Sequence, residues 1–236
     1  MTLEELAAQA PLFIKQTAAM ISGPKRFIAS IDAQAADTLR NALIYYVLAV
    51  AVSLALELPF TTGEGDFGDH LPSTALVLVL GVLLSSALLT GVWRVMGARG
   101  SFQRYLVVTL YIWGVGVLIW AVGALMAKGL MMVQAPALFP DYLEYMQLLL
   151  TNSELINSPK FKALNDSDAM LSTMLFFAAV QVLLIGWFVF SWGAYRATTQ
   201  LSATRAALAM MLYLLCLYPL SKIIQLAQHA AGITLF

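Results

Sequence analysis

The sequence is poor in the residues from which most catalytic and metal sites are built. Its 236 residues include one cysteine, Cys216, and two histidines. A single cysteine excludes a disulfide framework within the chain and a cysteine-rich metal site. His70 and His229 lack partners at metal-ligand spacing, and the chain has no HExxH, Gly-x-Ser-x-Gly, Walker or Gly-x-Gly-x-x-Gly motif. We therefore expect no metal, no cofactor and no catalytic residues, and predict that the protein is not an enzyme.

Charge is also scarce. Only 11% of the residues are charged, roughly half the usual share of a soluble domain. Thirteen basic and thirteen acidic residues cancel, which excludes a nucleic-acid binder driven by net positive charge. Hydrophobic residues make up 61% of the chain. Since a soluble protein of this size needs far more polar surface, the composition indicates a polytopic membrane protein.

Five apolar segments are long enough to cross a membrane, which takes about 20 residues of helix for a hydrocarbon core of roughly 30 Å. The predicted spans cover residues 41–59, 73–96, 105–127, 169–195 and 205–225. Their Leu- and Ala-rich runs favour helices over barrel strands, which alternate over only about 10 residues. The predicted fold is all-α, a transmembrane bundle of five spans preceded by an N-terminal segment (1–40) and followed by a short tail (226–236).

Apolar residues at helical spacing occur outside the spans as well. They are Leu3, Leu6, Ala7, Ala10 and Ile14, then Phe27, Ile31, Ala35 and Leu39, and in the loop 134–168 Tyr142, Leu143, Met146, Leu149 and Leu150. The loop set predicts an amphipathic helix on the outer membrane surface, followed by polar loop over 152–168. For the two N-terminal sets, helices in the membrane interface and helices packed on the protein are both open interpretations.

The basic residues predict the orientation. With the N-terminus inside, nine of them fall on the inner side and four on the outer side, and the first outer loop carries only acidic charge. By the positive-inside rule the N-terminus is cytoplasmic and the C-terminus extracytoplasmic. Seven inner residues form a candidate basic rim, namely Lys25, Arg26, Arg94, Arg99, Arg104, Arg196 and Arg205. Attraction to anionic lipid, at about 1 kcal/mol per charge, explains the rim more simply than a cytosolic partner does.

Strongly polar side chains are rare inside the predicted spans. Gln181 is the one near a span centre, where a hydrogen bond to a neighbouring helix is its expected role and a substrate contact the alternative. Glu57 and Lys128 fall at span ends, within reach of the headgroups. Trp120 lies too deep for an interfacial belt and is expected in the core.

One short string matches an enzyme motif. Residues 63–66 spell the Gly-x-Gly-Asp of intramembrane aspartyl proteases, whose chemistry needs two aspartates facing each other inside the membrane. No aspartate falls within a predicted span, so a turn explains these residues better. The absence of a midplane carboxylate also argues against coupled transport.

Several short elements together resemble the YIP (Yip/Yif) family of membrane proteins. They are Ser22 to Phe27, the pair Tyr45 and Tyr46, the connector Gly97 to Arg104 with Tyr111 beyond it, Trp187 to Tyr195, and Leu201 to Ala206. The resemblance covers residues 22–224, and the short N-terminal segment is similar to that of prokaryotic members. It implies a non-enzymatic integral membrane protein, of a bacterial inner membrane, with a role in membrane organisation or trafficking.

The resemblance also bears on partners. Eukaryotic members bind Ypt/Rab GTPases partly through a long cytoplasmic N-terminal region, and the short segment 1–40 argues against a GTPase here. We expect membrane lipids and either other membrane-protein subunits or a second copy of the chain as partners. A small permease or lipid-handling protein is the alternative function, because glycines and Gln181 are able to line a cavity in a compact bundle.

Overall fold

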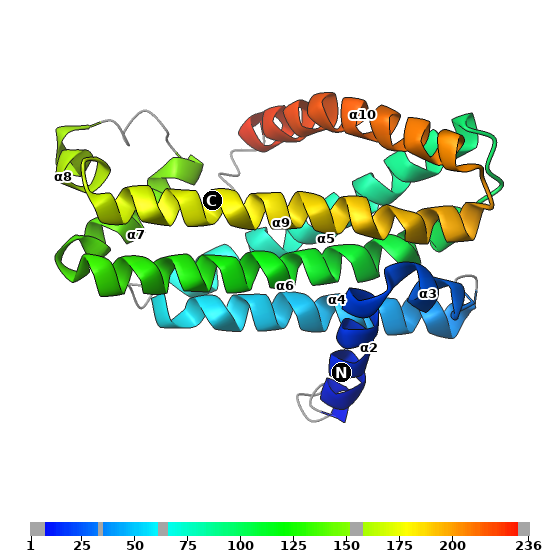
Figure 1. Cartoon of the computed structure of the whole chain (residues 1–236), viewed down its shortest axis with the longest axis horizontal. Helices are drawn as coiled ribbons and strands as arrows, with labels where there is room; N and C mark the ends of the chain where they lie inside the picture. The colour runs from blue at the N-terminus through cyan, green and yellow to red at the C-terminus, as the bar shows by residue number, and fades with distance from the viewer. Residues whose placement is uncertain (1–7, 33–34, 61–65, 152–157, 231–236) are drawn as a thin grey trace.

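The computed structural model describes residues 8–32, 35–60, 66–151 and 158–230. Over these residues the chain is helical and has no strand, which confirms the all-α class. Four helices are long and apolar enough to cross a membrane: α4 (Ala36–Glu57), α5 (Asp66–Val95), α6 (Phe102–Gln134) and α9 (Asp168–Thr199). They run roughly side by side along the long axis of the molecule (Figure 1). A fifth helix, α10 (Ala203–Ala230), holds a shorter apolar part, Ala203–Pro219.

The helices extend beyond most of the predicted spans because polar residues begin and end them outside the apolar run. Ser101 starts α6 by accepting a hydrogen bond from the backbone N–H of Arg104, and Ser167 starts α9 in the same way through Met170. Such N-caps satisfy donors that the first helical turn leaves free. At the end of α9, Gln200 takes a left-handed conformation that stops the helix.

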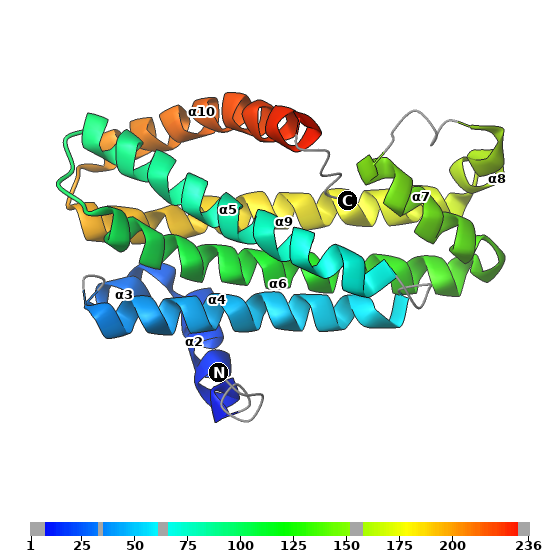
Figure 2. The same ribbon diagram turned by 180° about the vertical axis from the view of Figure 1, so that it is seen from behind.

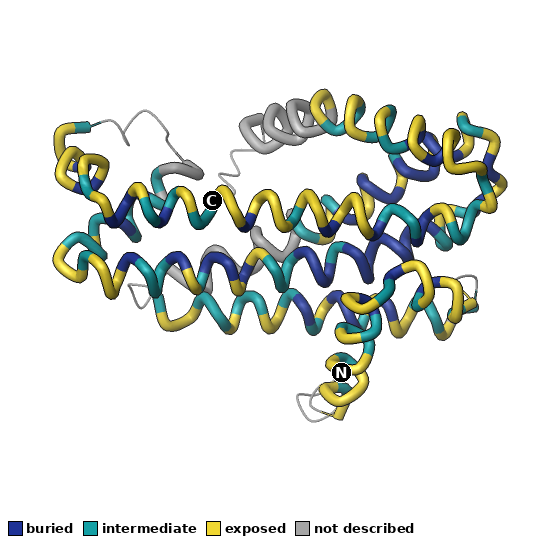
Figure 3. Tube along the Cα trace, viewed as in Figure 1, coloured by how far each residue is buried: buried dark blue, intermediate teal, exposed yellow. Residues whose placement is uncertain are grey.

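Helix α6 is the centre of the bundle and contacts α4, α5 and α9. Buried residues follow it over most of its length (Figure 3), and Figure 2 shows α5 crossing it obliquely. Two glycines allow its neighbours to come close. A Cβ atom at Gly114 would lie 2.6 Å from the ring of Tyr45 on α4, and one at Gly123 would lie 2.6 Å from Val180 on α9. Small residues thus set the helix spacing, as in other membrane bundles.

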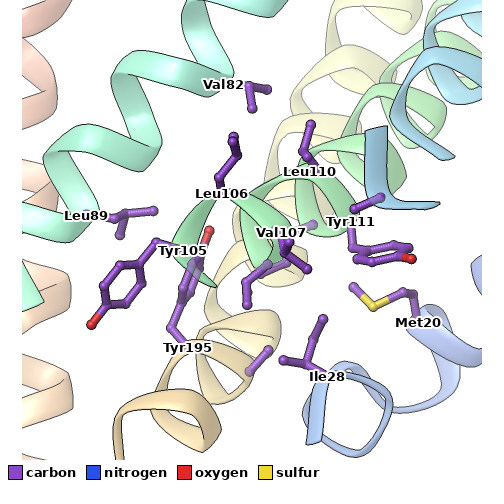
Figure 4. Close-up of a cluster of buried hydrophobic side chains, with 14 of the residues drawn as sticks. Met20, Ile28, Val82, Leu89, Tyr105, Leu106, Val107, Leu110, Tyr111 and Tyr195 are labelled. Atoms are coloured by element: carbon purple, nitrogen blue, oxygen red, sulfur yellow. The ribbon is translucent and has the colours of Figure 1, made fainter. Parts of the chain in front are cut away.

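The N-terminal helices α2 (Ala10–Ser22) and α3 (Pro24–Ala29) pack on the protein. α2 crosses the bundle steeply (Figure 1), and α3 lies against α9. Met20 and Ile28 are fully buried beside α6, near Tyr111 (Figure 4). Of the predicted apolar positions, Phe27 and Ile31 contact this core, whereas Ile14 is exposed. Leu3, Leu6 and Ala7 lie outside the described residues.

The connector between α6 and α9 builds a second, smaller core. It contains the expected helix, α7 (Phe139–Thr151), and then a 3-10 turn (Pro159–Phe161) and α8 (Lys162–Asn165). The core consists of Met131, Tyr142, Tyr145, Phe161, Leu164, Ala169 and Met170. The prediction of polar loop over 152–168 is wrong for residues 159–165, which form the 3-10 turn and α8. Phe161 and Leu164 bury this segment in the second core, and two apolar residues in a polar stretch are too weak a pattern to predict it. Residues 152–157 are outside the described part, as are the side chains of Leu149 and Leu150.

Helix α10 joins the bundle at the end where α9 finishes. Ala206 and Ala209 are buried, and the Tyr213 hydroxyl lies 2.6 Å from the Ser85 hydroxyl on α5. Beyond this point Leu214, Leu215 and Tyr218 are exposed. The last predicted segment, 226–236, begins inside α10, and its final residues 231–236 lie outside the described ones.

Candidate functional site

The residues of the predicted basic rim gather at one end of the bundle, where α5 and α9 finish and α6 and α10 begin (Figure 1). We call this the inner end, after the side of the membrane that the sequence predicts for it. Six of the seven are exposed, and Arg104 is half-buried. The predicted rim residues thus lie on elements that meet at the same end of the bundle. Its role in binding lipid or a partner stays a prediction.

Three of these arginines also hold the helix connectors in place. Arg104 donates a hydrogen bond to the carbonyl of Thr198 at 2.9 Å, and Arg196 donates through Nε to the carbonyl of Leu201 at 3.2 Å. The guanidinium of Arg205 lies over Gly97. Gly97 has a φ of +92°, a conformation that favours glycine. These arginines brace the inner end, so Lys25, Arg26, Arg94 and Arg99 are the rim residues whose charge is most available to a ligand.

Beneath the rim lies a group of packed aromatic rings. Trp93 stacks on Trp192 with ring centres 5.4 Å apart, and both contact Tyr195. The Trp192 indole donates to the carbonyl of Ala206 at 2.8 Å, and the hydroxyls of Tyr195 and Thr109 lie 2.9 Å apart. Buried Tyr and Trp side chains need such partners. The group fixes α5, α6, α9 and α10 relative to one another under the cationic surface.

The other end of the bundle, the outer end, carries a charge pair that the sequence interpretation missed. Lys128 on α6 forms an ion pair with Glu57 on α4, and the Lys128 ammonium lies 5.2 Å from the centre of the Phe60 ring. These two residues were expected to reach the headgroups separately. Their opposite charges at the outer ends of two spans were the available signal. Since both side chains are mostly buried, the pair ties α4 to α6 where the second core begins.

Tyr142 lies fully buried in that second core. Its hydroxyl has no hydrogen-bond partner among the described residues. Burial raises the pKa of the Tyr142 phenol to about 12, and the nearby negative charge of Glu57 adds to the rise. The side chain is therefore a neutral packing element, and the outer end offers no acid or base of ordinary pKa at this position.

Gln181 does not face the bundle interior. It is exposed on the outward side of α9 and makes no hydrogen bond to the described residues. The expected bond to a neighbouring helix is therefore not found among the described residues, because α9 turns Val180 rather than Gln181 toward α6. Trp120 is also 41% exposed and packs on Phe177, not in the core. A helix that is apolar all round gives no periodic signal for its inward face.

A lateral apolar groove of about 470 Å³ lies between α6 and α9. Val122 and Met126 of α6 and Ala179 and Leu183 of α9 line it, and Thr17 of α2 adds a polar hydroxyl. The volume is in the range of small-molecule pockets, and the walls are almost wholly hydrocarbon. Chemically the groove suits an acyl chain and offers nothing for acid–base or nucleophilic work.

The remaining sequence motifs stay without a site. In the Gly-x-Gly-Asp string, Gly63 to Gly65 lie outside the described residues, and Asp66 is the first residue of α5. No group of three or more His, Cys, Asp or Glu suited to a metal occurs within the described part of the chain.

Comparison of the chain with known protein families, with curated proteins and with solved structures finds no match. The resemblance to the YIP family therefore stays a prediction drawn from short sequence elements.

Proposed function

We propose that this chain is a non-enzymatic integral membrane protein of the YIP type that acts as an accessory subunit or organiser within a larger membrane assembly. The observation that carries the proposal is the contrast between its helices. α6 is enclosed, whereas α9 and the apolar part of α10 present long outward rows of large apolar side chains. Such rows suit lipid or the helices of a partner subunit.

The proposal includes five spans and an orientation. The apolar part of α10 covers Ala203–Pro219, and the helix continues to Ala230, so its length suffices for a crossing. With the basic inner end in the cytoplasm of a bacterium, as the positive-inside rule favours, five crossings of the inner membrane put the N-terminus inside and the C-terminus outside. A reporter active only outside the cytoplasm, fused after Phe236, should be active. A C-terminal reporter found in the cytoplasm would exclude the five-span arrangement.

Extraction into native-lipid nanodiscs tests the accessory role. We expect a stoichiometric membrane-protein partner, or a defined oligomer, to remain with the chain and to be visible by native mass spectrometry. If the basic rim binds anionic lipid, less of that lipid should remain with the protein than with wild type when four rim residues are changed to Gln, namely Lys25, Arg26, Arg94 and Arg99. A partner-free monomer in nanodiscs and in several mild detergents would contradict the proposal.

The groove between α6 and α9 supports a second candidate, a lipid-handling protein. Its apolar walls and the Thr17 hydroxyl fit one acyl chain with a polar end nearby. Ala179→Phe would fill the groove, whereas Leu208→Phe adds the same ring to exposed α10. If the chain moves lipid between reconstituted vesicles, Ala179→Phe should abolish exchange and Leu208→Phe should not. Exchange no faster than in protein-free vesicles would exclude this candidate.

A further inference from the structure

The seam between α6 and α9 is covered differently along its length. Toward the inner end α2 packs on α6, and α3 packs on α9 (Figure 1). Met20 of α2 and Ile28 of α3 are fully buried there. Farther out lies the lateral apolar groove, and Thr17 and Ile21 of α2 form its inner end. The protein's own apolar side chains thus cover the inner part of the seam, and the groove begins where they stop.

The groove has the length and depth of one membrane leaflet. On α6 it extends from Val115 to Met126, a rise of about 16 Å, against about 15 Å for half of a hydrocarbon core. Between Arg104 and Lys128, α6 carries no charged residue, so these two cations mark the ends of its apolar section. Val115 lies near the middle of that section, and Met126 lies two residues from Lys128. In a protein that spans the membrane, the groove therefore extends from the midplane to the outer surface.

The cross-section of the groove fits one flexible chain and not a second helix. A volume of about 470 Å³ spread over that length corresponds to about 30 Å². A helix with its side chains is 10–12 Å in diameter and occupies about 80–110 Å². Ala179 of α9 contributes only a methyl group to the wall, which helps to leave this narrow space.

The walls of the groove select hydrocarbon. Of the twelve described residues that line it, Thr17 alone has a polar side chain. The Thr17 hydroxyl donates a hydrogen bond to the carbonyl of Phe13 at 2.9 Å, so it is already satisfied within the protein. Water needs two to four polar partners to occupy a cavity, and an empty groove loses the dispersion contacts of its walls. A hydrocarbon chain at the same depth restores those contacts.

We infer that the groove holds one acyl chain of a phospholipid from the outer leaflet. This inference rests on the proposal that the protein spans a membrane, and it does not require the protein to move lipid. Because α2 closes the inner end, the acyl chain enters at the Met126 end, and its headgroup stays at the outer surface. Gly129, seven residues beyond Val122 and on the same side of α6, keeps this end open, since an added Cβ would meet no described atom within 4 Å.

Photoreactive phospholipids test both the occupant and its direction. The full chain is reconstituted with phosphatidylethanolamine that carries a diazirine either near the terminal methyl group of one acyl chain or near its carbonyl. After irradiation and digestion, mass spectrometry should find the terminal probe on Thr17 or Ile21 and the carbonyl-proximal probe on Met126 or Phe176. The reverse pattern would overturn the assignment to the outer leaflet. Equal labelling of exposed Leu208 on α10 would overturn a specific site.

Matched substitutions on α9 test the groove itself. Ala179→Phe adds a ring to the wall, whereas Ala178→Phe adds the same ring at the neighbouring exposed position, which does not line the groove. Labelling of α2 by the terminal probe should fall at least about ten-fold in Ala179→Phe and stay within about two-fold of wild type in Ala178→Phe. Equal labelling in the two variants would overturn the inference. Unaltered tryptophan fluorescence and elution verify that both are folded.

Other occupants give different results with the same probes. If the protein's own N-terminal residues fill the groove, α2 should be labelled only after residues 2–7 are deleted. If a partner protein fills it, α2 should be labelled only after that partner is removed. Either result would overturn the inference.

The two levels of proposal fail separately. No labelling of α2 in a protein that alkaline carbonate leaves in the membrane would overturn the acyl-chain site and leave the membrane-spanning proposal intact. Release of the protein from membranes by alkaline carbonate would overturn both.

Discussion

The inner and outer ends of the bundle are built in different ways. At the inner end the helices are joined by short connectors, 96–101 and 200–202, that are braced by arginine side chains and by Gly97. At the outer end the connector 135–167 is long and folds over the helix ends with a core of its own. The inner end depends on packed aromatic residues, of which Trp192 and Tyr195 are hydrogen-bonded. The outer end depends on apolar burial and on two ion pairs, Glu57–Lys128 and Glu144–Lys160.

The difference shows how connector length decides what holds a helix end in place. A short connector has too few residues to bury, so its geometry has to be fixed by backbone conformation and by groups on the helices themselves. A long connector has enough apolar side chains to form a satellite core, and needs one to compensate for the entropy of ordering it. Four substitutions probe this contrast.

Phe161→Ala should have the largest effect, because it empties the centre of the outer core. Phe161 is 1% exposed and packs edge-on against Tyr145. The cost should be about 3–4 kcal/mol, confined to the outer end. Limited proteolysis should show faster cleavage between Thr151 and Lys162, with tryptophan fluorescence unchanged, because none of the five tryptophans belongs to the outer core. The control Phe102→Ala, 39% exposed, should cost under about 1 kcal/mol. Loss of tryptophan fluorescence in Phe161→Ala would show that the outer core is not independent of the rest of the bundle.

Gly100→Val tests the inner connector. A Cβ atom at this position would lie 2.4 Å from the Tyr105 hydroxyl, so Tyr105 has to leave its site. We expect a loss of about 2–3 kcal/mol in unfolding by a denaturing detergent. Gly91→Val, where no atom lies within 4 Å of the added Cβ, is the matched control and should change stability little. Equal stability of the two variants would contradict the tight inner connector.

Lys128→Met should destabilise the outer end by about 1–2 kcal/mol, because it leaves Glu57 half-buried without its partner. Adding Glu57→Gln removes the remaining charge and should recover most of the loss. The interaction energy from the double-mutant cycle measures the pair. If the double variant is as unstable as the sum of the single ones, the ion pair contributes nothing to the tie between α4 and α6.

The smallest effects should distinguish two buried tyrosines. Tyr195→Phe at the inner end breaks a 2.9 Å hydrogen bond to Thr109 and should cost about 0.6–1 kcal/mol. Tyr142→Phe at the outer end removes a buried hydroxyl with no partner among the described residues, so stability should stay equal or rise slightly. Thermal unfolding in one detergent compares them. A larger loss from Tyr142→Phe would mean that its hydroxyl has a bound partner.

The sequence predicted the helices well and the lateral contacts poorly. Long apolar runs located the long helices, and arginines in short connectors located the end of the bundle where those connectors lie, because both signals are local. The expectation that Trp120 lies in the core failed, the exposure of Gln181 was not foreseen, and the Glu57–Lys128 pair was missed. Each depends on how one helix is rotated against another, and a helix that is apolar on all sides does not encode its own rotation.

The sequence by itself determined that this is an all-helical protein with membrane-length helices and that many of its basic residues lie on connectors at one end. Only the tertiary structure decided which helix became the centre. The apolar parts of α6 and α9 have almost equal mean hydropathy, 2.1 and 2.2, yet 67% of the first and 17% of the second is buried. Hydropathy measures the preference for leaving water, and lipid and protein interior satisfy it equally. Gly114 and Gly123 of α6 let Tyr45 and Val180 of the neighbouring helices pack closely against it, so α6 becomes the central helix. With Val180 turned toward α6, Gln181 is exposed on the outward side of α9.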